Sequence, residues 1–326
     1  MTNRIGAGQP PPGTLNVVIA LVAYAAAGFF LWLATRGGTY LVLSAVAYSF
    51  VGNTIFSLLH ESVHGKFHSS NAVNDVFGCV SAAFFPTGFT FQRICHFGHH
   101  RRNRTDAEMF DYYYPGDSRL LKCYRLYSLL TGFYWLAIPI GCLLYLLFPA
   151  LATSAAVRER VVRPTGLGPM LADLKTAPTA RTRMEITFTI AFQVLLVCSL
   201  KLSLLSWLCC YAAFALNWCS LQYTDHAWTV RDVKNGASNL KVNKAVQYIF
   251  LNYHHHLAHH QNPQVSWIRL HKFVDFTAAR PGFLKTYLSL WRGPRMTMEP
   301  PPRAIDADLQ RQVSPGPRTI PGLGRV

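Results

Sequence analysis

Thirteen histidines are unevenly distributed along the chain, and the densest group lies between Asn252 and His260. In this group, His256, His259 and His260 stand at positions i, i+3 and i+4. On a helix, this spacing places the three side chains on one face, where they converge. Neutral imidazole is a good ligand for iron, zinc, copper and nickel. The group therefore predicts a metal site.

Two further groups repeat this pattern earlier in the chain. The first holds His60 and His64, and the second holds His96, His99 and His100 at the spacing of the third group. A single histidine, His226, follows the last long apolar block. Because one metal ion takes roughly three to six donors, eight or nine imidazoles suit two ions.

The composition indicates an integral membrane protein. Apolar residues make up 51% of the 326 residues, and charged residues only 14%, against about a quarter in soluble domains. Lysine and arginine gather between the apolar runs, so the net charge of +16 suits anionic lipid headgroups. We expect no nucleic acid partner. Eight scattered cysteines without a Cys-x-x-Cys pair favour buried thiols over disulfides.

The apolar runs predict how the chain crosses the membrane. Leu15–Leu33 and Tyr40–Leu59 should form a hairpin of two spans, and Tyr127–Leu151 a third run with a kink at Pro139. Ile186–Leu221 is long for one span and short for two, so both readings remain open. In either case the number of crossings is even, and all histidine groups return to one membrane face.

Shorter segments complete the expected organisation. Residues 72–91 should form a re-entrant or surface-lying segment, and Pro281–Trp291 a short amphipathic helix on the membrane surface. Residues 1–14 and 293–326 should be disordered, with one membrane domain at 15–292. The fold class is thus all-α: a multi-pass bundle of about four spans with a helical cap that holds a histidine-rich site for two metals.

The ordered set of histidine groups resembles the membrane fatty-acid desaturase and hydroxylase superfamily over roughly Leu15–Trp267. The resemblance implies two iron ions on the cytoplasmic side of the bundle. It also implies that Gln222, four residues before His226, binds a metal through a water molecule. Nine histidines would be the ligands: His60, His64, His96, His99, His100, His226, His256, His259 and His260.

Several polar residues near these histidines are candidates to orient the ligand imidazoles. Glu61 stands where many relatives have aspartate, and so keeps a carboxylate between His60 and His64. Other candidate acceptors for imidazole N–H groups are Asn103, Asp106, Glu108 and Asp225. Nearby aromatic residues are expected either to line a channel for an apolar substrate or to pack the bundle; they are Phe89, Phe91, Phe97, Tyr253 and Trp267.

The resemblance further implies an activity and its partners. Such an enzyme uses dioxygen and two electrons to oxidise an unactivated C–H bond in a lipid. We expect fatty-acyl desaturation, with hydroxylation or ketolation of a lipid or carotenoid as the alternative. The chain has no His-Pro-Gly-Gly, Cys-x-x-Cys or Gly-x-Gly-x-x-Gly motif. Electrons are therefore expected from a separate donor, a ferredoxin-like carrier or a reductase.

Two functions of other classes also fit part of the pattern. His60-Glu61-x-x-His64 matches the two-histidine-plus-base motif of an intramembrane zinc peptidase, although six histidines of the groups then have no role. A metal transporter would use the histidine-rich loops to bind cargo. Acidic residues would then be expected along the membrane path, and the apolar runs carry almost none.

Overall fold

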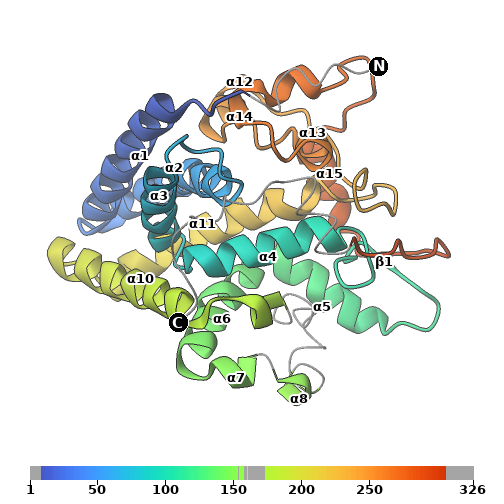
Figure 1. The fold of residues 1–326 in the computed structure, drawn as a ribbon, viewed down its shortest axis with the longest axis horizontal. Coiled ribbons are helices and arrows are strands. Elements are labelled where there is room, and N and C mark those ends of the chain that lie inside the picture. The colour runs from blue at the N-terminus through green and yellow to red at the C-terminus, as the bar shows by residue number, and fades with distance from the viewer. Residues whose placement is uncertain (1–8, 153, 158–159, 161–172, 306–326) are drawn as a thin grey trace, which may run out of the picture.

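The computed structural model describes residues 9–152, 154–157, 160 and 173–305, and the chain is almost entirely helical (Figure 1). Within these residues, four helices are long and apolar enough to cross a membrane. They are α1 (Gly13–Ala34), α2 (Gly38–Val63), α10 (Thr179–Leu200) and α11 (Leu204–Thr224). The protein is therefore an integral membrane protein of the expected all-α class.

The first hairpin joins α1 to α2 through a turn at Gly37 and Gly38, with φ of 69° and 53°. These left-handed values favour glycine. The second helix continues to Val63, four residues beyond the predicted end of the span. His60 consequently lies in the last turns of α2, whereas the sequence placed it just after the span.

The second hairpin settles the reading of the long apolar block, because α10 and α11 are two separate helices that turn at Lys201. Helix α10 begins seven residues before the predicted Ile186, in a polar stretch. Its polar side chains are paired: Arg181 contacts Asp75 and Glu185 at 2.8 Å each. Ion pairing thus lets charged residues enter the first turns of an otherwise apolar helix.

The third apolar run does not cross the membrane as one straight helix. Helix α5 (Arg119–Leu130) meets the 3₁₀ helix η1 (Phe133–Leu136) and helix α6 (Ala137–Leu147) at 87°. The bend lies at Gly132, whose φ is 85° and where a Cβ would come within 2.8 Å of the Leu216 backbone. Pro139, the predicted kink, lies instead in the first turn of α6, where its missing N–H leaves no bond unmade.

Helix α3 (Asn71–Phe84) occupies most of the segment 72–91 that was expected to be re-entrant or surface-lying, and α4 (Phe89–Arg102), also of 14 residues, begins at its end. Both are too short to span a bilayer. Between α6 and α10 the structure describes three short helices: α7 (Pro149–Ala152), α8 (Ala155–Val157) and η4 (Leu174–Thr176). The cap is completed by α12 (Lys244–Ile249), α13 (His256–Gln261), α14 (Trp267–Leu270) and η5 (His271–Phe273).

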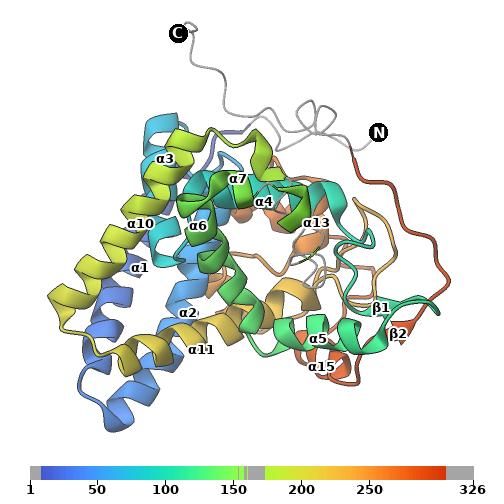
Figure 2. The ribbon, with the colours of Figure 1, turned by 90° about the horizontal axis from the view of Figure 1, so that it is seen from below.

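The end of the described chain also packs on the cap. Helix α15 (Phe283–Leu290) forms where the amphipathic helix was expected. Beyond it, strand β2 (Arg295–Met296) pairs in parallel with β1 (Tyr112–Tyr113), and Figure 2 shows the two side by side. Folded chain therefore extends past 292, which differs from the expected disorder from 293 onward. The predicted tail residues 306–326 and the N-terminal residues 1–8 lie outside the described residues.

An aromatic seam joins α2 to α11 and fixes the histidine-bearing ends of both helices. Tyr48 packs edge-on against Tyr211 at 5.3 Å between ring centroids, and Phe56 against Trp218 at 5.2 Å. All four side chains are buried. Such edge-to-face pairs have a preferred geometry and add to the stabilisation by burial. The seam therefore sets the relative position of the ends of α2 and α11.

Helix α4 is anchored by a buried carboxylate from α10. Glu185 accepts hydrogen bonds from the backbone N–H of Thr90 at 2.5 Å and from its hydroxyl at 3.0 Å. Both donors lie in the first turn of α4, where backbone N–H groups lack partners within the helix. The carboxylate thus fixes the start of the helix that carries the second histidine group.

Replacing Glu185 by alanine should lower the free energy of unfolding by about 3 kcal/mol, because two buried donors lose a charged acceptor. Unfolding of the purified protein in detergent micelles measures the change. Arg183→Ala, an exposed position on the same helix, is the matched control and should change stability by about 0.5 kcal/mol or less. Equal stability of the two variants would contradict the anchoring role.

Candidate metal centre

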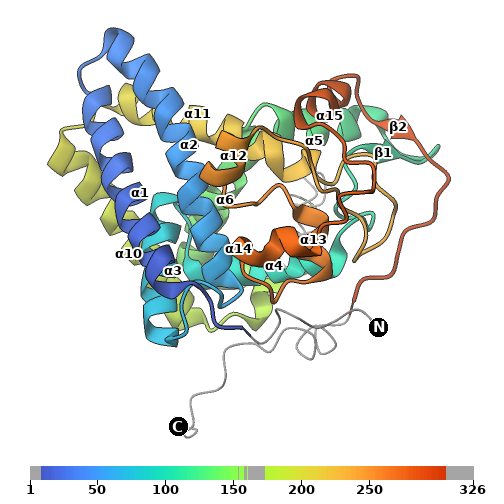
Figure 3. The ribbon, with the colours of Figure 1, turned by 90° about the horizontal axis from the view of Figure 1, so that it is seen from above.

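Four separate elements bring histidines to one end of the bundle. His60 and His64 lie at the end of α2, the second group lies on α4, His226 follows α11, and the third group lies on α13. Figure 3 shows α13 beside α4 at this end of α2. The nine histidines selected from the sequence therefore meet in space.

The nine side chains form two clusters, in each of which the ligand nitrogens lie within 4.8 Å of one another. Cluster A contains His60, His64, His96, His100 and His259, and cluster B contains His99, His226, His256 and His260. Seven of these side chains are buried, and those of His64 and His99 are partly buried. Each of α4 and α13 contributes histidines to both clusters.

The ring nitrogens within each cluster face one another at short range. In cluster A, the Nε2 atoms of His96 and His64 are 2.8 Å apart, and those of His96 and His100 are 3.0 Å apart. In cluster B, the Nε2 of His256 lies 3.0 Å from that of His226. Two nitrogens that bind one ion at about 2.1 Å and at a right angle are about 3.0 Å apart. The spacing therefore fits imidazoles that share a metal ion.

Burial keeps the imidazoles in the form that binds metal. Desolvation, followed by the neighbouring imidazoles, lowers the pKa of His96, His100 and His259 well below the usual value. In cluster B, the pKa values of His226 and His256 are lowered for the same reasons. These five imidazoles are thus neutral at physiological pH, with lone pairs available to a cation.

Groups outside the clusters hold the rings in this orientation. Glu108 contacts the Nδ1 of His99 at 2.6 Å, and the carbonyl of Gly236 contacts the Nδ1 of His226 at 2.8 Å. A ring that donates from Nδ1 leaves Nε2 free for a metal. Both contacts serve cluster B, and Glu108 was among the acceptors expected from the sequence.

Asp225 places a fully buried carboxyl group next to cluster B. Its Oδ2 lies 3.5 Å from the Nδ1 of His256, and its side chain is fully buried. Neither carboxylate oxygen has a hydrogen-bond partner among the described residues, and burial raises the Asp225 pKa well above its usual value. A cation in cluster B would favour the ionised form of the Asp225 carboxyl group, whose negative charge is otherwise costly to bury.

Two of the expected acceptors have other partners. Asn103 donates to the carbonyls of Val233 and Gly236 at 3.1 Å, so it fixes the loop whose carbonyl contacts His226. Asp106 pairs with Arg231 at 2.7 Å. Among the described residues, neither contacts an imidazole as was expected from the sequence, since spacing along the chain does not show which way a loop side chain turns.

Glu61 also points away from both clusters. Its Oε2 accepts a hydrogen bond from the backbone N–H of Trp267 at 3.2 Å, at the start of α14. Within the described residues, no hydrogen bond joins Glu61 to an imidazole. A peptidase base must face the metal-bound water, so this orientation disfavours the zinc peptidase.

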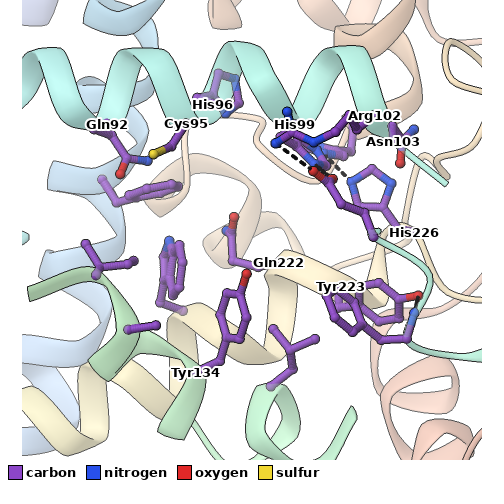
Figure 4. A pocket seen from close by; sticks show the side chains of 18 of the residues that line it. Gln92, Cys95, His96, His99, Arg102, Asn103, Tyr134, Gln222, Tyr223 and His226 are labelled. Atoms are coloured by element: carbon purple, nitrogen blue, oxygen red, sulfur yellow. Dashed lines mark hydrogen bonds and ion pairs between the residues drawn. The ribbon is translucent and has the colours of Figure 1, made fainter. Parts of the chain in front are cut away.

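A cavity of about 150 Å³ borders both clusters. Figure 4 shows α4 along one side of it, with His96, His99 and His226 at the edge and Gln222 and Tyr134 directed into it. The rest of the wall is mainly apolar, with Phe56, Phe91, Ile138 and Trp218 among its residues. This combination suits an apolar substrate next to metal-binding nitrogens.

Gln222 occupies a position in this cavity that fits its expected role. Its Oε1 accepts a hydrogen bond from the Tyr253 hydroxyl at 3.0 Å, whereas its Nε2 is buried without a partner among the described residues. The same cavity is lined by Tyr253, His99 and His226. An unpaired amide here can bind a water molecule between side chain and metal.

The sequence identified only part of the cavity wall. Of the five aromatic residues proposed as a channel, Phe91 and Tyr253 line the cavity, and Phe89, Phe97 and Trp267 do not. Trp218 was missed, although it stands one helical turn before Gln222 on α11. That i, i+4 relation is the signal that places both side chains on one face.

Three histidines near the third group remain outside both clusters. His254 and His255 are buried, and burial lowers their pKa values to about 3 and about 4. His271 is exposed on η5. Histidines that are close together in the sequence therefore differ in whether they belong to a cluster.

Replacing His259 by alanine should remove bound metal, because cluster A loses a nitrogen that lies 3.0 Å from His100. Elemental analysis of the purified protein measures metal per chain. His271→Ala is the matched control, since its side chain belongs to neither cluster, and should keep the wild-type content. Equal loss in both variants would show that the clusters do not hold the metal.

The chain was also compared with known protein families. Residues 37–293 match the family model of the fatty acid desaturases, a segment that includes all nine clustered histidines. A comparison with curated proteins found no match. Because the matched segment covers most of the chain and ends within the cap, the chain belongs to the fatty acid desaturase family.

Proposed function

We propose that this protein is a dioxygen-dependent di-iron oxidase that desaturates a fatty acyl chain. The observation that carries the proposal is the pair of histidine clusters beside one apolar cavity. Nitrogen donors of this kind suit iron. Two bound iron ions would supply the activation of dioxygen that an unactivated C–H bond requires.

The chain's own residues divide the work between holding the ions and holding the substrate. Cluster A would hold one ion with five imidazoles, and cluster B the other with four. Cluster B has fewer protein donors, and Gln222 lies in the cavity beside it. We infer that Gln222 holds a water molecule at this open position, oriented by the hydroxyl of Tyr253.

The apolar part of the cavity would position the acyl chain and exclude water. Phe56 and Trp218 pack against each other at 5.2 Å and form a rigid part of the wall. A chain lying against them would run past His96 and His99 at the edge of the clusters. Fixing the carbon to be oxidised near the metal side gives regioselectivity by position alone.

The distribution of basic residues supports a cytoplasmic active site. The two hairpin turns at the far end of the spans contain Arg36 and Lys201 as their basic residues. The cap end carries many more, including Arg101, Arg102, Lys234 and Lys241. Since cytoplasmic segments carry the excess of lysine and arginine, the cap and both clusters would face the cytoplasm.

We further infer that a separate acidic protein supplies the electrons. The net charge of +16 favours association with a negatively charged carrier, ferredoxin-like or a reductase. Turnover with such a donor should then slow as ionic strength rises, because salt screens the attraction. Steady-state rates measured from low to high salt test this. A rate that is insensitive to salt with the native donor would contradict it.

The product of the reaction tests the main proposal. Purified protein loaded with ferrous iron, supplied with a reductase system, dioxygen and a lipid extract, should give acyl products that lack two hydrogens. Mass spectrometry distinguishes these from products that have gained one oxygen, which would establish the hydroxylase alternative. Product formation should require iron, and His259→Ala should abolish it. Activity with zinc as the sole metal would overturn the proposal.

A further inference from the structure

A second cavity, of about 380 Å³, lies on the other side of α11 from the clusters. Asn217 and Leu221 of α11 line this cavity, whereas Trp218 and Gln222 of the same helix line the first one. One step along a helix turns the side chain by about 100°. The two cavities are therefore separated by the body of α11. The proposed reaction does not use the second cavity.

The second cavity is apolar inside and cationic at one end. Its walls include Phe50 of α2, Val246 of α12, Phe250 and Phe283. No acidic residue lines it. Lys241 is its only charged lining residue, and its side chain makes no ion pair among the described residues.

Hydrogen bonds fix the frame of this cavity. The backbone N–H of Lys241 donates to the carbonyl of Pro281 at 2.8 Å, and its carbonyl accepts from Phe283 at 3.1 Å. On the opposite side, the hydroxyls of Thr54 and Ser57 on α2 donate to the carbonyls that end α12, at 2.7 and 3.0 Å. The backbone at Lys241 and the C-terminal end of α12 are thus held in place by defined contacts.

The cavity lies at the boundary between the membrane and the cap. Phe50 and Asn217 belong to the candidate spans α2 and α11, while Val246 and Phe283 belong to the cap helices α12 and α15. Figure 3 shows α12 lying against α2. Around the cavity, the side chains of Tyr248, Leu284 and Leu288 are 70%, 63% and 56% exposed. Such exposed apolar groups are expected where a protein surface meets lipid.

We propose that this cavity is a binding site for an anionic phospholipid. One acyl chain occupies the space between Phe50, Val246 and Phe250, and the headgroup phosphate binds the ammonium group of Lys241. The apolar walls match a hydrocarbon chain, and the single cation matches the phosphate. Two further exposed lysines nearby, Lys244 and Lys285, strengthen the attraction for an anionic membrane surface.

The test measures lipid retained by the purified full-length protein. Wild type and variants are exchanged into micelles that contain equal amounts of dioleoyl phosphatidylglycerol and dioleoyl phosphatidylcholine, and bound lipid is counted by native mass spectrometry. Lys241→Glu should reduce retained phosphatidylglycerol by roughly five-fold or more, because a single lysine contributes about this factor to the binding of an anionic headgroup. Val246→Trp should reduce it as well, because the larger side chain fills the space for the acyl chain.

Lys272→Glu is the matched control, since it makes the same charge change at an exposed position of η5 outside the cavity. It should retain phosphatidylglycerol as wild type does. Metal content and circular dichroism confirm that each variant is folded. Wild-type retention by both cavity variants, or equal loss in the control, would overturn the proposal. The proposal would also be overturned if Val246→Trp lost binding of added oleate but kept wild-type retention of phosphatidylglycerol, since the cavity would then bind a free acyl chain.

Discussion

The structure depends on the convergence of nine imidazoles in a small, largely buried volume. Their nitrogens lie within 4.8 Å of one another in each cluster, and several Nε2 atoms face one another at 2.8 to 3.1 Å. A buried polar nitrogen without a partner is costly. A cation bound in each cluster would satisfy these nitrogens, and the rest of the fold supplies the rigidity that keeps them assembled.

That rigidity comes from contacts between elements that are distant in sequence. The aromatic seam of α2 and α11 fixes two sets of ligands, and Glu185 fixes the start of α4. A third contact holds the cap: Asp111 accepts from Arg104 at 2.7 Å and from the Tyr223 hydroxyl at 2.6 Å, with all three side chains buried. Because Tyr223 lies near the end of α11, this network ties the loop after α4 to the helix that leads to His226.

The sequence predicted several elements and the histidine groups because both follow from local patterns. Apolar runs predicted the first hairpin and left open whether Ile186–Leu221 forms one span or two, and the i, i+3, i+4 spacing predicted the convergent histidines. Features that depend on another segment were missed. The bend at Gly132 arises because the backbone of α11 passes too close for a side chain, so the more obvious Pro139 was the wrong choice. Likewise, Arg181 near the start of α10 pairs with Asp75, about a hundred residues away along the chain.

The division of the histidines between the clusters is the feature that spacing could least predict. On α4, His96 and His100 join cluster A and His99 joins cluster B; on α13, His256 and His260 join cluster B and His259 joins cluster A. In both helices the i, i+4 pair serves one cluster and the residue between serves the other. The histidine face of each helix therefore lies across both clusters. It follows that the separation of the two clusters is set by the pitch of α4 and α13, and that a displacement of either helix disturbs both clusters together.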